Sequence, residues 1–175
     1  ELNLRLGAVF YRDQGDEFIT RSFNLSGDWG AIIEHIATQE ANGGGDYPEA
    51  VDLGVETGIM QQNWSDTAIS RLVFLVLDAP PHKQNAAISK IRETVKYASQ
   101  SGVKIIPVTA SGTDLSTEML MRFMAISTNG TYVFITDDSG IGGDHLEPSV
   151  GDYKVEYLNE LMIRLIKKYS ERISY

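Results

Sequence analysis

Residues 71–82 read RLVFLVLDAPPH. The segment contains six consecutive apolar residues, Leu72–Leu77, followed by the acid Asp78 and, after Ala79, by two prolines. A continuous apolar run of this length, bounded by breakers, is typical of a β-strand that is covered on both faces. Proline has no N–H to donate to a strand ladder, so we expect the strand to stop near Asp78. The chain therefore places a carboxylate at the carboxyl end of a central strand, the edge where open α/β sheets bind ligands.

Other apolar or β-rich runs predict four further strands, at Leu4–Tyr11, Phe18–Leu25, Val103–Val108 and Thr131–Ile135. The first two are separated by the short turn Gln14–Asp16, which predicts an antiparallel hairpin whose second strand lies at a sheet edge. Between the later strands, apolar residues recur at helical spacing. Strands that alternate with helices imply right-handed crossovers, so we expect an α/β fold with a mainly parallel sheet and helices on both faces.

The helices are predicted from their end signals and their apolar stripes. Ser26 is a candidate N-cap for the first helix. Asp46 is a candidate N-cap for the second helix, whose first turn would contain Pro48 and Glu49. A third helix is predicted over residues 85–100, and Gly102 is its candidate C-terminal cap. A fourth helix is predicted to begin at Ser116, and a fifth is predicted around residues 157–166. The stripes expected to face the core include Trp29, Ile32, Ile33 and Ile36 in the first helix, and Leu120, Phe123 and Met124 in the fourth. His35 is expected to face solvent.

The composition limits the classes of function. The 175 residues suit one domain, and the net charge of −9 argues against nucleic acid, since phosphate binding needs clustered Lys and Arg. The chain has no cysteine, which excludes disulfides, thiolate metal sites and a cysteine nucleophile. No apolar run approaches the roughly 20 residues of a membrane span. We expect an extracellular or periplasmic location over a cytoplasmic one, although the absence of cysteine does not identify the compartment.

Acids and hydroxyls gather at the predicted strand ends. They are Asp13, Asp78, Ser111, Asp137 and Asp138, with Asp46 directly after the three glycines at residues 43–45. Hard divalent cations such as Mg²⁺ prefer several oxygen ligands of this kind. The alternative is that these acids cap helices and face water.

Other chemistries fit less well. His82 and His145 are loop histidines, but no H-x-x-x-H or comparable spacing supports zinc. No G-x-S-x-G elbow, G-x-G-x-x-G motif or Walker loop is present. A phosphoacceptor receiver domain would use Asp13, Asp78 and Thr109 or Ser111. That site also needs a lysine after the last strand, where this chain has Thr136 followed by two acids.

Taken together, Leu4–Arg12, Phe18–Asn24, the segment Gly43–Ala50 and Leu72–His82 resemble a von Willebrand factor type A (vWA) domain, most closely its bacterial members. Val103–Ala110 and Thr131–Thr136 continue the likeness, which covers nearly the whole chain. The resemblance implies a Rossmann-like sheet with one antiparallel edge strand. It also implies a metal-ion-dependent adhesion site for Mg²⁺ at the carboxyl edge of that sheet.

Within that resemblance, Asp46 and Asp78 match two elements of the metal site. The third element, an Asp-x-Ser-x-Ser motif after the first strand, is missing. We therefore expect residues 1–175 to be a single vWA-like domain that begins after the family's first strand and helix. Mg²⁺ binding should then be weak or absent in this chain. The strands at Leu4–Tyr11 and Leu72–Leu77 would lack their shared neighbour, so they would pair with each other, with another chain such as a second copy, or with a segment outside this sequence.

The leading hypothesis is a non-enzymatic, adhesion-type domain that binds a protein ligand with the help of a metal ion in the intact protein. A second hypothesis keeps the fold but makes the domain a structural or assembly module with a vestigial site. A third is a metal-dependent hydrolase or phosphoryl-transfer enzyme that uses Asp13, Asp78 and Asp138.

Overall fold

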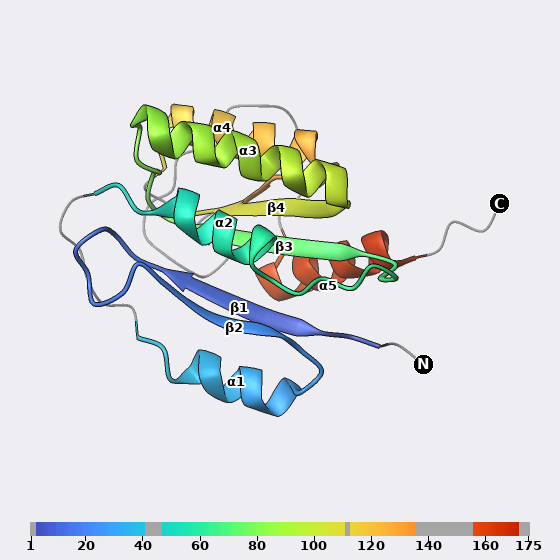
Figure 1. The fold of residues 1–175 in the computed structure, drawn as a ribbon. Helices are drawn as coiled ribbons and strands as arrows, with labels where there is room; N and C mark the ends of the chain where they lie inside the picture. The colour runs from blue at the N-terminus through green and yellow to red at the C-terminus, as the bar shows by residue number, and fades with distance from the viewer. Residues whose placement is uncertain (1–2, 41–46, 111–112, 136–155, 172–175) are drawn as a thin grey trace. The chain divides into compact units, whose positions relative to one another are not determined.

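The computed structural model describes residues 3–40, 47–110, 113–135 and 156–171 (Figure 1). The chain is mixed α/β, with a two-stranded antiparallel sheet and a three-stranded parallel sheet, which confirms the predicted class. It divides into two compact units. We call Glu1–Asp66 with Pro81–Tyr97 the hairpin unit, and Thr67–Pro80 with Ala98–Tyr175 the sheet unit.

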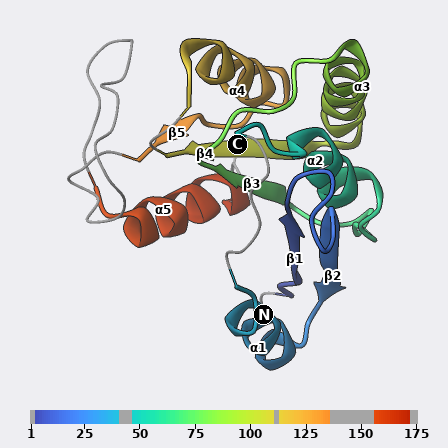
Figure 2. The same cartoon turned by 90° about the vertical axis from the view of Figure 1, so that its left-hand side faces the viewer.

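The hairpin unit is built on strands β1 (Leu6–Tyr11) and β2 (Thr20–Ser26), which pair antiparallel as predicted. The turn between them contains Gly15 at φ +100°, a conformation that glycine adopts without strain. Helices α1 (Trp29–Ala37) and α2 (Val51–Met60) lie on opposite faces of this hairpin (Figures 1 and 2). The hairpin is thus covered by a helix on each face.

The prediction for the buried face of α1 is wrong. Ile32 is buried, whereas Trp29, Ile33 and Ile36 are all exposed. Apolar residues surround most of this short helix, so helical spacing alone does not single out the face that packs. The helix is capped by Asp28, whose Oδ1 accepts a hydrogen bond from the Ala31 N–H at 3.0 Å, and not by Ser26.

His35 does not face solvent as predicted. Its ring centroid lies 5.9 Å from that of Phe10 and 5.3 Å from that of Phe23. Phe10 and Phe23 belong to β1 and β2, so the imidazole packs on the hairpin beside Ile32. A histidine presents an apolar ring body as well as two polar nitrogens, and here the ring body decides its place.

Helix α2 begins later than predicted. Its first residue is Val51 and its N-cap is Ala50, so Pro48 and Glu49 precede the helix. Glu49 pairs instead with Pro81 in an isolated parallel bridge. Asp46, the predicted cap, lies outside the described residues. Helical spacing predicts a buried stripe of Val51, Val55, Ile59 and Met60 in α2. The first three are buried as predicted, whereas Met60 is 44% exposed.

Glycine sets how closely α2 approaches the hairpin. A Cβ atom on Gly54 would lie 2.7 Å from Cδ1 of Tyr11, which is closer than side chains pack. On the far side, α2 lies along helix α3 (Asn85–Ser101), where Lys90 Nζ is 2.7 Å from Glu56 Oε2. Helix α3 ends as predicted at Gly102, which has φ +70°.

The sheet unit contains three parallel strands in the order β3 (Arg71–Leu77), β4 (Val103–Thr109) and β5 (Val133–Phe134). β5 is shorter than the predicted strand Thr131–Ile135. Helix α4 (Leu115–Ser127) lies on one face of this sheet and α5 (Leu158–Ser170) on the other (Figure 2). The core beneath α5 is formed by Ile106, Val108, Val133, Ile135 and Leu165.

The prediction that β3 is covered on both faces is only partly correct. Leu75 and Leu77 are buried, but Val76 between them is 55% exposed. Over the described residues β3 pairs with β4 alone, and β1 pairs with β2 alone. The two strands that would share a missing neighbour are therefore not seen to pair with each other. Over the described residues β3 is therefore an edge strand of its sheet.

Helix α4 also corrects the sequence prediction. Met121 and Met124 are buried, whereas Phe123, which was expected in the core, is 47% exposed. The N-cap is Asp114, whose Oδ1 accepts hydrogen bonds from the Thr117 N–H and the Thr117 hydroxyl, each at 2.7 Å.

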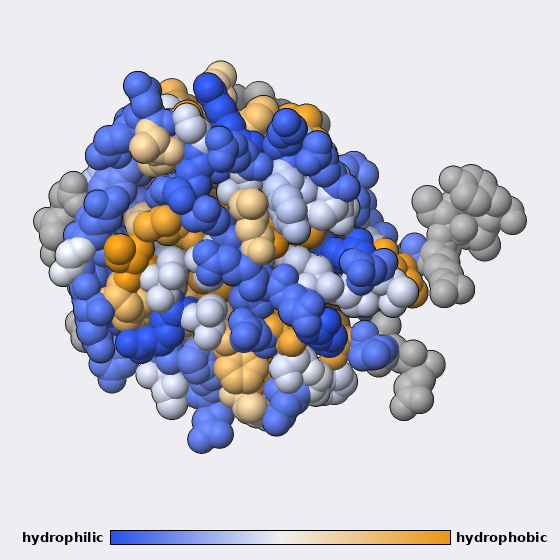
Figure 3. All heavy atoms as spheres, in the orientation of Figure 1, coloured by the Kyte–Doolittle hydropathy of each residue, from blue (hydrophilic) through white to orange (hydrophobic). Residues whose placement is uncertain are grey.

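The surface mixes polar and apolar side chains. The face shown in Figure 3 is mostly hydrophilic, with apolar side chains interspersed. Among the described helices, none is long and apolar enough to cross a membrane.

Candidate functional site

Asp78 lies where the sequence placed it. β3 ends at Leu77, and Asp78 follows as an exposed residue. Leu77 is in register with Thr109 of β4, and the Leu77 carbonyl accepts a hydrogen bond from the Ala110 N–H at 2.9 Å. The carboxyl ends of the parallel strands therefore meet at one edge of the sheet, where Asp78 presents its carboxylate to solvent. An exposed carboxylate at this edge is a suitable single ligand for a hard cation.

Only Asp13 and Asp78 of the predicted metal set belong to the described part of the chain. Asp46 lies outside the described residues, as do Ser111, Asp137, Asp138 and His145. Within the described part of the chain, no group of three His, Asp or Glu side chains is arranged to hold a metal ion. The pairing of Asp46 with Asp78 therefore stays a prediction. Asp78 alone does not make a site for Mg²⁺.

Asp13 and His82 form a buried pair that sequence reasoning missed. Asp13 follows the end of β1 and is 5% exposed, and His82, in the hairpin unit, is 8% exposed. Asp13 Oδ1 lies 2.5 Å from His82 Nε2. Each residue was identified singly as a strand-end acid or a loop histidine, but 69 residues separate them in the chain. No local pattern could have paired them.

Neighbouring contacts hold both members of this pair in place. The turn after β1 closes when the Asp13 N–H donates to Asp16 Oδ2 at 3.2 Å. His82 directly follows Pro81, whose backbone forms the bridge with Glu49. The loop before α2 and the loop before α3 are thereby joined beside the pair.

The chemistry of the pair is limited by its surroundings. An imidazole oriented by a carboxylate is the acid–base half of a hydrolytic triad. A triad also needs a hydroxyl or thiol that the imidazole activates, and Asp13 is the only hydrogen-bond partner that the described residues give the His82 ring. Asp13 is also turned inward, which does not favour the hydrolase hypothesis in which Asp13 would act together with Asp78. The pair is best interpreted as a structural contact.

Asp52 is a second buried carboxylate of the hairpin unit. It is the second residue of α2 and is 6% exposed, and its Oδ1 has no hydrogen-bond partner among the described residues. A carboxylate in the first turn of a helix is stabilised by the backbone N–H groups and by the helix dipole. The position thus supplies part of the compensation that a buried charge requires.

Thr109, a candidate hydroxyl at the end of β4, is not available to a ligand. It is fully buried, and its Oγ1 lies 2.8 Å from the Tyr132 hydroxyl and donates to the Val133 carbonyl at 3.3 Å. The receiver-domain alternative would then depend on Ser111, which lies outside the described residues. Burial, the largest effect, raises the pKa of Tyr132, and nearby Glu118 raises it further, while the Thr109 hydrogen bond and Arg122 lower it.

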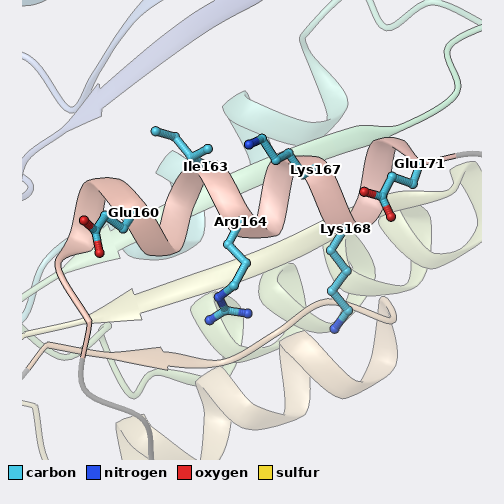
Figure 4. Close-up of a pocket in the computed structure, with 6 residues that line it drawn as sticks. All are labelled: Glu160, Ile163, Arg164, Lys167, Lys168 and Glu171. Carbon is cyan, nitrogen blue, oxygen red and sulfur yellow. The ribbon is translucent and has the colours of Figure 1, made fainter.

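The outer side of α5 carries an open hollow lined by charged side chains (Figure 4). The residues are Glu160, Ile163, Arg164, Lys167, Lys168 and Glu171. Arg164 and Lys168 point to one side of the helix, whereas Ile163 and Lys167 point to the other. Arg164 is also paired with Glu156. Because the side chains diverge, the hollow does not focus charge on one ligand.

Fold and site together define a mixed α/β protein with a parallel sheet and an exposed acid at the carboxyl edge of that sheet. When the chain is compared with known proteins, no protein-family model matches it and no curated protein is similar enough to count as a relative.

Proposed function

We propose that the chain is a non-enzymatic, adhesion-type protein-interaction domain of the vWA kind, with a Rossmann-like sheet whose carboxyl edge meets the partner. One observation carries the proposal: Asp78 is exposed directly after a parallel strand, at the sheet edge where α/β folds bind ligands. In this proposal Asp46 and Asp78 are the residues that would hold Mg²⁺. The ion would supply a contact for an oxygen ligand of the partner.

The fit of Mg²⁺ to this chain is partial. Asp78 is the only member of the proposed set within the described residues, and the sequence has no Asp-x-Ser-x-Ser motif. A cation that prefers six oxygen ligands gains little from two carboxylates. We therefore expect weak binding by residues 1–175 and stronger binding by a longer chain that supplies such a motif.

Titration of Mn²⁺, followed by calorimetry, tests the metal part. We expect weak binding to the 175-residue chain, and a further loss of affinity with Asp46→Ala or Asp78→Ala. Asp66→Ala, which removes another exposed acid, is the matched control and should bind like the unsubstituted chain. Equal binding by all four proteins would contradict the site. It would leave the alternative of an assembly domain with a vestigial site.

A further inference from the structure

Helix α4 exposes a continuous apolar row on the side away from its buried methionines. Leu115, Met119, Phe123 and Ile126 are 70, 74, 47 and 80% exposed. At 3.6 residues per turn these four positions fall within an arc of about 80°. The row extends for about 16 Å at 1.5 Å per residue. Isolated exposed apolar residues are common, but an aligned row of four large ones along a helix indicates an interaction surface.

The opposite face of α4 shows that this row is not the core-facing side. Met121, Met124 and Ala125 are buried, and α4 packs on β4. The helix is also anchored at its end, where the Thr128 hydroxyl accepts a hydrogen bond from the Ile105 N–H at 2.9 Å. Rotating α4 to bury the apolar row would break these contacts. No described residue of the sheet unit covers the row, so the row takes a partner from elsewhere or remains in water.

The shape of the row favours a helix as that partner. Side chains spaced by four and three residues form a ridge that packs into the groove between ridges of another helix. Met119 adds a flexible, polarisable contact of the kind that adapts to different partners. A standard dimer interface involves about 20–30 residues on each side, far more than one row of four. The row fits a peptide-sized ligand better than a second copy of the chain.

The negative charge of the chain favours a partner helix that is positively charged. The chain carries a net charge of −9, so two copies repel each other, as do this chain and an anionic membrane. Exposed acids also mark the start of the row: Asp114 precedes Leu115, and Asp78 lies at the same carboxyl edge of the sheet from which α4 begins. Arg122, the cation on α4 itself, is paired with Glu118 at 2.7 Å. A cationic partner is therefore favoured.

We propose that the apolar row of α4 binds a basic amphipathic helix of another protein. This proposal deepens the interaction function argued above by naming the class of partner, but it does not require a metal ion. The apolar face of the partner would cover Met119 and Phe123, and its lysines or arginines would approach Asp114 and Asp78.

The probe is an 18-residue helical peptide of Leu and Lys with one apolar and one cationic face, labelled for fluorescence anisotropy. We expect it to bind the full chain, and to bind Met119→Glu or Ile126→Glu at least tenfold more weakly. Ile33→Glu, which changes an apolar position on α1 that is 65% exposed, is the control and should bind like the unsubstituted chain. A scrambled Leu/Lys peptide and a Leu/Glu helix should bind at least tenfold more weakly. Binding should persist in EDTA, so the result does not depend on a metal ion held by Asp46 and Asp78.

Three results would overturn the proposal. One is equal peptide binding by Met119→Glu and the unsubstituted chain. Another is a dimer, seen by sedimentation velocity, that Met119→Glu abolishes, because the row would then bind a second copy. The third is binding to neutral phosphatidylcholine vesicles that Met119→Glu abolishes, because the occupant would then be lipid. Circular dichroism on each variant confirms that the fold is kept.

Discussion

Gly130 leaves no room for a side chain. It follows α4, its N–H donates to the Ala125 carbonyl at 2.8 Å, and a Cβ atom there would lie 1.9 Å from the Ile105 carbonyl oxygen. Gly130→Ala should therefore lower the free energy of unfolding by at least about 2 kcal/mol, measured by urea denaturation. Gly27→Ala is the control, since nothing lies within 4 Å of its Cβ position. A Gly130→Ala protein as stable as Gly27→Ala would refute the close approach.

The Asp13–His82 pair predicts coupled effects on stability. His82→Ala removes the imidazole beside a buried carboxylate, and should cost about 3 kcal/mol, as should Asp13→Ala. The double variant should lose less than the sum of the two, because the second substitution removes a buried polar group that has already lost this contact through the first. Urea denaturation of all four proteins measures this coupling. Additive effects would show that the two side chains do not depend on each other.

Tyr132 predicts a loss of stability in alkali. Its pKa is raised in the folded chain, chiefly by burial, so the folded state keeps the phenol proton to a higher pH than the unfolded state. The stabilisation is fully present below the ordinary pKa of about 10 and is lost as the pH rises through the folded-state pKa. Thermal unfolding of Tyr132→Phe between pH 8 and 11 should show a smaller alkaline decline than the unsubstituted chain. An identical decline in both proteins would assign it to other groups.

Asp78, His82 and Thr109 show which features of the site could be predicted from the sequence and which could not. The position of Asp78 follows from a local rule, because two prolines end a strand at a definite place. The partner of His82 does not, because it depends on how the chain folds back across 69 residues. For Thr109, the strand end was predicted, but its burial against Tyr132 was not. A hydroxyl at the right strand end is therefore not by itself a ligand.

At the scale of the element, α4 predicts opposite responses on its two faces. Met121→Ala removes a fully buried side chain and should cost about 2–5 kcal/mol of unfolding free energy. Met119→Ala, two residues earlier and largely exposed, should change it by less than about 0.5 kcal/mol. The same residue type on the same helix makes the comparison direct. Urea denaturation checks it, and equal effects would contradict the assigned orientation.

Helices α1 and α4 explain why helix existence was easier to predict than helix orientation. Both segments contain more apolar residues than one face can bury, so two stripes compete for the core. In α1, the contact of His35 with the rings of Phe10 and Phe23 determines which stripe is buried. In α4, the packing of Met121 and Met124 on β4 determines it. In α2, where one stripe dominates, Val51, Val55 and Ile59 are buried as predicted, and only Met60 at the end of the helix is exposed.

At the scale of the whole molecule, the alternation of strands and helices predicted the parallel order of β3, β4 and β5, because crossovers of this kind leave few other topologies. That residues 1–175 form one vWA-like domain stays a prediction. The division into two units follows three-dimensional contacts and not sequence order. The chain leaves the sheet unit after Pro80 and returns to it within α3, between Tyr97 and Ala98.

This shared helix predicts that the units unfold together. Neither unit is one continuous stretch, and α3 contributes residues to both, so melting either unit breaks the helix on which the other depends. Both tryptophans, Trp29 and Trp64, belong to the hairpin unit, so their fluorescence reports on that unit alone. Amide hydrogen exchange of β4, monitored across the same urea series, reports on the sheet unit. We expect the two transitions to have the same midpoint. If fluorescence changes at a lower urea concentration than β4 exchange, the hairpin unit opens on its own and α3 does not couple the two units.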